Sequence, residues 1–148
     1  MLIRQLYLLP IIIFTLFIAS CSPVQLAKPE QDSIAKSFSV ESGKSNIYIY
    51  RNETENFNSE MAVDIDGKYV GGTTQRTFIV SSVQPGKHII NAHGENVSEI
   101  EITTEAGKNY FVWLEVTVGA FIPRATLHAV DQETGKVGVK ECNLIKSK

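Results

Sequence analysis

The sequence predicts an all-β fold, either a β-sandwich or an open barrel of about eight or nine short strands. From Asn46 onward, apolar and polar residues alternate with a period of two, which is typical of strands with one buried face. Glycine, proline, asparagine and aspartate interrupt this alternation at intervals of about ten residues, as turns between short strands do. Because no long helical period interrupts the series, we expect one β-domain over residues 45–148.

Residues 1–20 have the three parts of an export signal. Arg4 is the only charged residue, an apolar run follows over Leu6–Ile18, and small residues precede a cysteine. An apolar residue, two small residues and a cysteine form the lipobox of bacterial lipoprotein signal peptides, whose cysteine thiol receives a thioether-linked diacylglycerol. We therefore expect a lipid on Cys21, and signal-peptidase recognition of Ile18, Ala19 and Ser20 before residues 1–20 are removed.

The alternative interpretation of residues 1–20 is a plain transmembrane anchor. A membrane-spanning helix needs about 20 apolar residues, whereas this run is shorter and contains Pro10 and Thr15. The lipoprotein interpretation makes the lipid on Cys21 the attachment to a membrane of the bacterial cell envelope. In enteric bacteria, aspartate after the cysteine retains lipoproteins at the inner membrane, so by analogy Ser22 indicates the outer membrane, facing the periplasm.

Residues 21–44 are predicted to be the lipidated N-terminus and a flexible linker. Ser22–Lys44 contains Pro23, Pro29 and several serine and lysine residues without a sustained apolar period, with a short helix over Gln31–Phe38 as an alternative. A flexible chain of this length has a root-mean-square reach of about 25 Å, and fully extended it reaches at most about 80 Å. We therefore expect the domain to stand away from the membrane surface.

The charge and cysteine content restrict the classes of function. The chain has 14 Lys and Arg against 16 Asp and Glu, and removal of residues 1–20 takes away Arg4, which leaves a net charge of about −3. Because no basic stripe is present, nucleic acid is not an expected partner. If Cys21 carries lipid, Cys142 has no disulfide partner in the chain, so it is either buried and inert or available for intermolecular pairing.

A β-hairpin is the most specific local prediction. An apolar alternation over Met61–Ile65 leads directly into Asp66-Gly67. Asp-Gly supplies the two residues with positive φ that a type I′ turn requires, and this turn matches the twist of the flanking strands. Its register predicts two cross-strand pairs, Val63 with Val70 and Asp64 with Tyr69.

The same alternation predicts further strands at Ile47–Tyr50, Thr77–Val83, Lys87–Ala92 and Glu99–Thr103. Gln84-Pro85-Gly86 has the proline and glycine of a type II turn, which makes Lys87–Ala92 the return strand of Thr77–Val83.

Tyr110–Val118 is the most hydrophobic stretch of the domain and is predicted to be a central strand. Its even-numbered residues share one face, while Phe111 and Trp113 make the other face apolar too. Strands at Arg124–Val130 and Val137–Leu144, joined by a short turn, are expected to close the chain. The predicted core takes apolar residues from most strands: Ile49, Val63, Val80, Ile90, Ile102, Val112, Leu114 and Leu127.

Three strings of the domain combine turns and strands in a characteristic way. They are Val63-Asp64-Ile65-Asp66-Gly67-Lys68-Tyr69-Val70-Gly71, Val83-Gln84-Pro85-Gly86-Lys87-His88 and Ala106-Gly107-Lys108-Asn109-Tyr110-Phe111-Val112. Together they resemble a family of small bacterial lipoproteins with a domain of unknown function, which is similar to the PEGA domain of envelope proteins. The resemblance covers about Ile47 to Gly135 and implies an Ig-like or PEGA-like antiparallel β-sandwich of about 7–9 strands, tethered by lipid, without a catalytic residue.

No group of residues indicates an enzyme, a metal site or a cofactor site. His88 and His93 are an odd number of residues apart on one predicted strand, so they point to opposite faces and cannot share a metal ion without distortion. Glu99 and Glu101 are close enough for a pair of glycosidase carboxylates but lie on an alternating, solvated strand. The sequence motifs of nucleotide, zinc and nucleophile sites are missing.

Two functional hypotheses follow. The first is a non-enzymatic binding or assembly module, held at the envelope, with a protein or cell-wall partner. The second is an envelope hydrolase whose site assembles from residues far apart in the sequence. Phe121 and Ile122 are candidate partner-binding residues, because they are apolar in a connection where polar residues are usual. The alternative is that both side chains fold back and plug the end of the sandwich.

Overall fold

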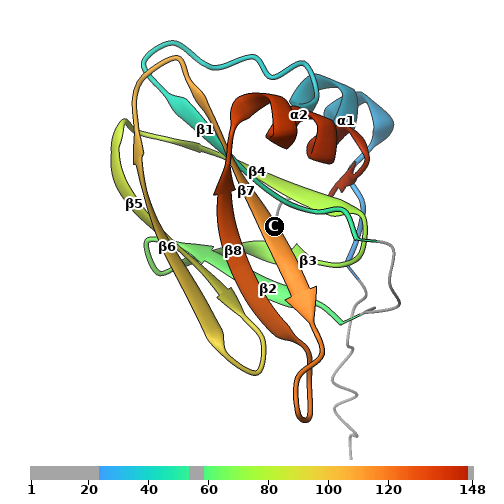
Figure 1. Ribbon diagram of the computed structural model, residues 1–148. Coiled ribbons are helices and arrows are strands. Elements are labelled where there is room, and N and C mark those ends of the chain that lie inside the picture. The colour runs from blue at the N-terminus through green and yellow to red at the C-terminus, as the bar shows by residue number, and fades with distance from the viewer. Residues whose placement is uncertain (1–23, 54–58, 147–148) are drawn as a thin grey trace, which may run out of the picture.

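The computed structural model describes residues 24–53 and 59–146. In this part of the chain, nine strands form two sheets that pack face to face, and two helices cover the outer face of the larger sheet (Figure 1). The two sheets remain separate and do not close into a barrel. The prediction of an all-β sandwich is therefore confirmed.

The larger sheet has the strand order β8-β7-β1-β4-β9, with bounds Arg124–Val130, Asn109–Thr117, Ser45–Arg51, Thr77–Val83 and Asn143–Leu144 in that order. The smaller sheet has the order β3-β2-β5-β6, with bounds Lys68–Thr73, Met61–Ile65, Gly86–His93 and Val97–Thr104. The helices are α1 (Pro29–Ala35) and α2 (Gln132–Lys140). β7 lies parallel to β1, and β9 lies parallel to β4. The expectation of an antiparallel sandwich is therefore wrong for these two pairs. Parallel strands need a long connection, and in both pairs the strands are far apart in the sequence. A tight hairpin, by contrast, would join antiparallel strands.

The main hydrophobic core lies between the two sheets. β1 is buried along its whole length, because it is the middle strand of the larger sheet and is covered on both faces. β7, the predicted central strand, lies beside β1 and carries the two apolar faces that the sequence predicts. Seven predicted core residues are in this core, whereas Val80 faces the helices: Ile49, Val63, Ile90, Ile102, Val112, Leu114 and Leu127.

Residues 24–44 are folded onto the domain, so the prediction of a flexible linker is wrong for this segment. The ring of Phe38 packs against Tyr48 and Phe111, with ring centroids 5.4 and 5.8 Å apart. The Tyr48 hydroxyl donates a hydrogen bond of 2.9 Å to the carbonyl of Ala35 at the end of α1. The segment is ordered because it covers aromatic side chains on the outer face of the larger sheet that would otherwise contact water.

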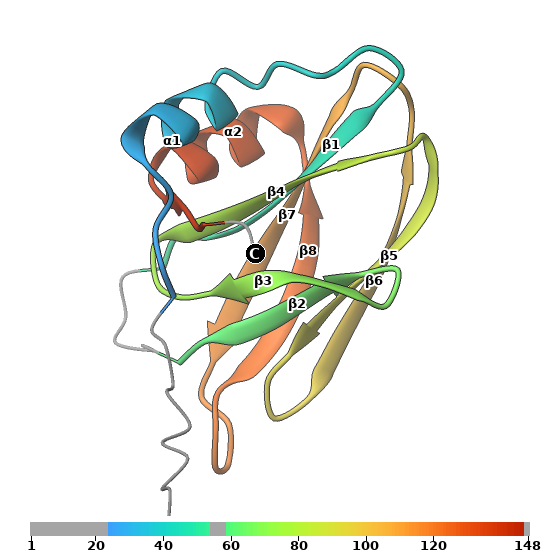
Figure 2. The same cartoon turned by 180° about the vertical axis from the view of Figure 1, so that it is seen from behind.

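Residues 132–140 form helix α2, so the predicted strand over Val137–Leu144 is wrong apart from the two residues of β9. Asp131 begins the helix, and its carboxylate accepts hydrogen bonds of 2.9 Å from the backbone N–H groups of Glu133 and Thr134. Val139 then packs into a second core between α2 and the larger sheet. The helix therefore closes the outer face of that sheet (Figure 2).

The turn between β2 and β3 has positive φ at both residues, 53° and 74°, as the type I′ prediction requires. The predicted pair of Asp64 with Tyr69 forms. Val63, however, lies opposite Gly71 instead of Val70, because a β-bulge adds one residue to β3 at this point.

β4 and β5 form close to their predicted bounds, but they do not pair with each other. β4 pairs with β1 in the larger sheet, and β5 pairs with β2 and β6 in the smaller sheet. The turn at Pro85-Gly86 therefore carries the chain from one sheet to the other. Both strands still bury their apolar faces in the same core, from opposite sides.

Candidate functional site

The residues of the predicted lipidation signal, Ile18, Ala19, Ser20 and Cys21, lie outside the residues that the structure describes. Neither helix in residues 24–53 and 59–146 is long and apolar enough to cross a membrane.

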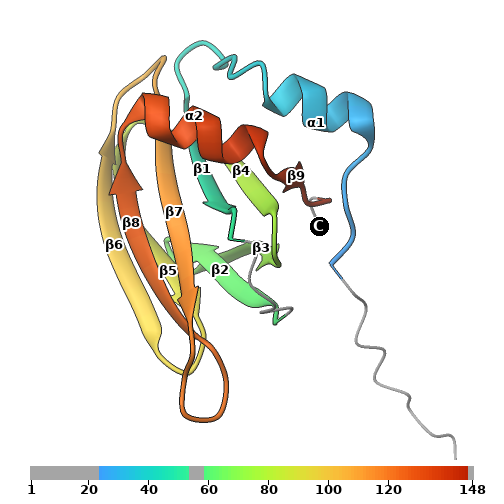
Figure 3. The same ribbon diagram turned by 45° about the vertical axis from the view of Figure 1, so that its right-hand side comes forward.

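Phe121 and Ile122 lie in the loop between β7 and β8, at the end of the sandwich opposite the helices (Figure 3). The plug alternative is wrong, because 95% of Phe121 and 55% of Ile122 are exposed. The Glu95 carboxylate, in the turn between β5 and β6, accepts a hydrogen bond of 2.8 Å from the N–H of Phe121 and pairs with Arg124 at 3.3 Å. Hydrogen bonds from the backbone N–H groups of Phe121 and its neighbours lower the pKa of the Glu95 carboxyl group. The loop therefore presents Phe121 to the surroundings on a backbone that is held in place.

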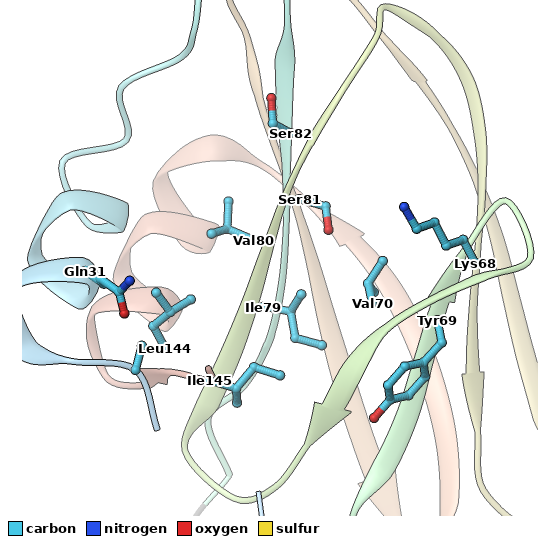
Figure 4. Close-up of a pocket in the computed structure, with 11 residues that line it drawn as sticks. Gln31, Lys68, Tyr69, Val70, Ile79, Val80, Ser81, Ser82, Leu144 and Ile145 are labelled. Atoms are coloured by element: carbon cyan, nitrogen blue, oxygen red, sulfur yellow. The ribbon is translucent and has the colours of Figure 1, made fainter. Parts of the chain in front are cut away.

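A groove of about 410 Å³ lies on one side of the sandwich, between the edge strand β3 and strand β4 (Figure 4). Its volume is in the range of protein ligand sites. The lining residues come from β3, β4, the C-terminal strand and the segment around α1: Lys68, Tyr69, Val70, Ile79, Val80, Ser81, Ser82, Leu144, Ile145, Ala27 and Gln31.

β4 has a free edge along this groove. β9 pairs only with Thr77 and Phe78, and the N–H of Ile145 donates a hydrogen bond of 3.0 Å to the Phe78 carbonyl. In an antiparallel strand, every second residue directs its N–H and C=O groups to the same side. The backbone groups of Val80 and Ser82 therefore point away from β1, to the side where the described chain provides no further strand.

Polar and apolar side chains line different parts of the groove. Figure 4 shows the Lys68 ammonium group on the side of Ser81 and Ser82, while Ile79 and Ile145 lie together at the opposite end. The side chain of Lys68 has no hydrogen-bond or ion-pair partner within the described part of the chain. The groove therefore combines apolar surface, a free backbone edge and an unpaired cation.

Each of the three histidines pairs with a carboxylate: His88 with Asp66 at 2.7 Å, His93 with Asp64 at 2.6 Å, and His128 with Glu115 at 2.9 Å. His88 is nearly buried at one end of the core, whereas His93 lies on the exposed face of the smaller sheet, so the predicted opposite orientation is correct. Burial alone would lower the pKa of His88, but hydrogen bonds to Asp66 and to the Gln84 carbonyl raise it. Among the described residues, no cluster of three or more metal-binding side chains forms.

Cys142 is buried, which agrees with one of the two interpretations that the sequence left open. Its thiol donates a hydrogen bond of 3.4 Å to the carbonyl of Arg51. Burial raises the pKa of the thiol to about 12, so the group stays protonated at neutral pH. The side chain contributes to the second core as a small apolar residue.

No local pattern in the sequence predicts the groove. Its walls belong to separate stretches, around residues 27–31, 68–70, 79–82 and 144–145, which come together only in the folded chain. Ser81-Ser82, two polar residues in a row within a predicted strand, is the one local signal of an exposed edge. The alternation alone does not reveal which strand lies at an edge.

The comparisons with known proteins identify a family without an assigned activity. The family described as "Protein of unknown function (DUF2846)" matches residues 41–124, which include β3, β4 and the loop with Phe121. A relative from Haemophilus influenzae, named only "Uncharacterized protein", is 32% identical over 148 residues, which cover 98% of this chain and 88% of the relative. The chain therefore belongs to the DUF2846 family of proteins of unknown function.

Proposed function

We propose that this protein is a lipid-anchored protein of the bacterial cell envelope and acts as a non-enzymatic binding module. Its site is the groove between β3 and β4, and its ligand is an extended segment of a partner protein. The observation that carries the proposal is the free backbone edge at Val80 and Ser82 beside this groove. Strands added to such an edge gain affinity from main-chain hydrogen bonds and specificity from side-chain pockets.

The chain's own C-terminal segment already uses the first part of this edge. β9 lies parallel to β4 and pairs with Thr77 and Phe78, after which the ladder ends. A partner segment would continue along β4 where β9 stops, opposite Val80 and Ser82. Leu144 and Ile145 would form the near end of its binding site.

The lining of the groove defines the chemistry of the partner segment. Side chains on one face of that segment would contact Val70 and Ile79, so they would be apolar. Lys68 would then pair with a carboxylate of the segment. Because an exposed ion pair contributes only about 0–1 kcal/mol, we expect Lys68 to select among segments rather than to supply most of the affinity.

The lipobox Ile18-Ala19-Ser20-Cys21 supports a lipid anchor on Cys21. Ser22 supports location at the outer membrane, with the domain facing the periplasm. The resemblance to small lipoproteins with a PEGA-like domain supports the same address, and two packed sheets are in keeping with that resemblance.

The alternative of an envelope hydrolase has less support. A hydrolytic site needs a nucleophile or a water molecule beside an activating base. In the described part of the chain, Ser81 and Ser82 line the groove, but no histidine or carboxylate lines it with them. The histidines lie elsewhere and are paired in turns and on sheet faces.

Ser82→Pro tests the role of the β4 edge, because proline removes the N–H that faces the groove and leaves the ladder with β1 in place. Ser82→Ala is the matched control, since it keeps that N–H. Peptides selected from a phage-displayed library against the full-length protein in detergent should carry alternating apolar residues and an acidic residue. They should bind Ser82→Ala like the wild type and should lose most of their affinity for Ser82→Pro. Lys68→Glu should weaken binding more moderately, and mainly of the peptides that carry the acidic residue. Equal binding to all variants, at unchanged melting temperature, would contradict a site in the groove.

Cys21→Ala tests the anchor separately. The variant should lack lipid and should accumulate as a precursor that retains residues 1–20, detected by intact-protein mass spectrometry. A variant that is processed normally and remains membrane-bound would contradict the lipoprotein assignment.

A further inference from the structure

The loop between β7 and β8 exposes three large apolar residues at the end of the sandwich opposite the helices: Val118, Phe121 and Ile122. We propose that this loop inserts into the surface of the lipid bilayer that holds Cys21. The inference rests on the lipidation proposed above, and it adds a second membrane contact and an orientation for the domain.

The folded N-terminal segment restricts the distance between the domain and the proposed anchor. Val24 packs against the main core. Two backbone hydrogen bonds join the following residues to the C-terminal segment: one of 2.7 Å from the Lys146 N–H to the Gln25 carbonyl, and one of 2.8 Å from the Ala27 N–H to the Leu144 carbonyl. The chain from Cys21 to Val24 can span at most about 11 Å. The domain is therefore confined to the membrane surface, whereas a flexible linker over residues 21–44 would let it stand far away.

The direction of the chain favours the loop as the surface that faces the membrane. In Figures 1 to 3, which turn the molecule about the vertical axis, both helices lie at the top and the β7–β8 loop lies at the bottom. Followed backward from α1, the described chain runs down and away from the helices, toward the end that carries the loop. An anchor that continues from Val24 therefore starts nearer to the loop end than α1 does.

The loop has the chemistry of a group that enters a lipid interface. Val118 is 76% exposed and Phe121 is 95% exposed, and no charged residue occurs between Val118 and Pro123. Arg124, which follows, is compensated by Glu95 at 3.3 Å. An exposed apolar cluster of this kind marks a surface that is covered in use, and the nearby bilayer is an apolar partner that the anchor itself supplies.

Two backbone N–H groups of the loop already have a hydrogen-bond partner within the protein. The Glu95 carboxylate accepts hydrogen bonds of 2.8 and 3.4 Å from the N–H groups of Phe121 and Ile122. Insertion therefore leaves these two donors paired, which removes much of the desolvation penalty for a loop. Gly119 allows a tight loop, because a Cβ there would lie 1.9 Å from the Ile122 carbonyl oxygen. A preformed loop loses little further conformational freedom when it inserts.

A spin-label experiment on the full-length lipidated protein in phospholipid vesicles tests the orientation. Val118→Cys carries the label in the loop, and Val137→Cys, an equally simple replacement of an exposed valine on α2, is the matched control. Cys142 should not react, because it is buried and its thiol stays protonated. Accessibility to oxygen, which concentrates in lipid, is compared with accessibility to a water-soluble nickel complex, and mass spectrometry confirms the lipid on Cys21.

We expect the ratio of oxygen to nickel accessibility to be several-fold higher at residue 118 than at residue 137. Phe121→Asp in the labelled Val118→Cys protein should bring the ratio down to that of the control, at unchanged melting temperature. Equal ratios at residues 118 and 137 in lipidated protein would overturn the inference and would leave the loop as a candidate contact for a protein partner. Absence of lipid on Cys21 would instead overturn the proposed function, and this inference with it.

Discussion

Gly138 of α2 lies directly against the aromatic ring of Tyr50 in β1, and a Cβ on this glycine would be 2.1 Å from the ring carbon Cε2. Gly135, one turn earlier, approaches Phe111 in the same way, since a Cβ on this glycine would be 2.2 Å from the Cβ of Phe111. The two glycines allow α2 to lie close to the outer face of the larger sheet, so that both aromatic residues are almost fully buried. Without this approach, the rings would remain partly in contact with water.

Gly138→Ala should destabilise the protein. Alanine is favoured over glycine in a helix by about 1 kcal/mol, but a methyl group at this distance must displace Tyr50 or the helix, and overpacking costs typically about 1–3 kcal/mol. Because the added methyl group would lie only 2.1 Å from a ring carbon, we expect the upper part of the overpacking range. The net loss in the free energy of unfolding should then be about 1–2 kcal/mol, measured in urea by circular dichroism. Val137→Ala, at an exposed position of the same helix, should change stability by less than about 0.5 kcal/mol. Wild-type stability in Gly138→Ala would be inconsistent with the observed contact.

Phe38→Ala tests the docking of the N-terminal segment. The side chain is half-buried against two aromatic rings, so its truncation should lower the free energy of unfolding by about 2 kcal/mol, somewhat below the range for a fully buried phenylalanine. Ser33→Ala, at an exposed position of α1, should be neutral. Equal thermal melting of the two variants would mean that residues 24–44 add nothing to the folded domain.

The pair of His88 and Asp66 should make stability depend on pH. The folded-state pKa of His88 is raised, so its contribution is fully present below about pH 6.5, the unfolded value, and is lost as the pH rises through the folded value. The pKa of Asp66 is lowered, chiefly by the hydrogen bond to His88. The stability that Asp66 contributes is therefore fully present above about pH 3.9, the unfolded value, and is lost as the pH falls through the lower folded value.

Asp66→Asn should keep the turn, because asparagine tolerates the positive φ of this residue. Urea unfolding at about pH 6 and about pH 8 should show a smaller loss of stability with rising pH in the variant than in the wild type. His88→Gln, which removes the titrating group itself, should also reduce that pH dependence. An identical dependence in wild type and Asp66→Asn would refute the role of this pair.

Cys142 should be unreactive in the folded protein. Burial raises its thiol pKa to about 12, and the thiolate is the species that attacks maleimides and disulfides. Peptide mass spectrometry after maleimide treatment should find Cys142 unmodified under native conditions and fully modified in urea. Rapid native labelling, or a dimer linked through Cys142 on a non-reducing gel, would contradict the buried position.

Phe121→Ala should leave folding intact. The side chain is exposed and is held outside the core, so the change in the free energy of unfolding should stay below about 0.5 kcal/mol. Leu114→Ala, a buried residue of the neighbouring strand β7, should lose about 2–5 kcal/mol in the same urea titration. A loss of similar size for Phe121→Ala would restore the plug interpretation.

The features that the amino-acid sequence determined by itself are those set by near neighbours. The Asp66-Gly67 turn formed because two adjacent residues accept positive φ. The bounds of β8, Arg124–Val130, and the two apolar faces of β7 followed from alternation along one strand. The all-β class followed in the same way, because the period of two recurred in strand after strand.

Only the tertiary structure decided which strands pair, what covers the larger sheet and which surfaces stay open. Residues 132–140 became a helix because Asp131 caps them and because glycines allow them to lie on rings contributed by β1 and β7. The free edge of β4 depends on the strand order, and the exposure of Phe121 depends on Glu95, in a different hairpin. These features arise from contacts between residues that are distant in the sequence, so their energies depend on partners that no local pattern specifies.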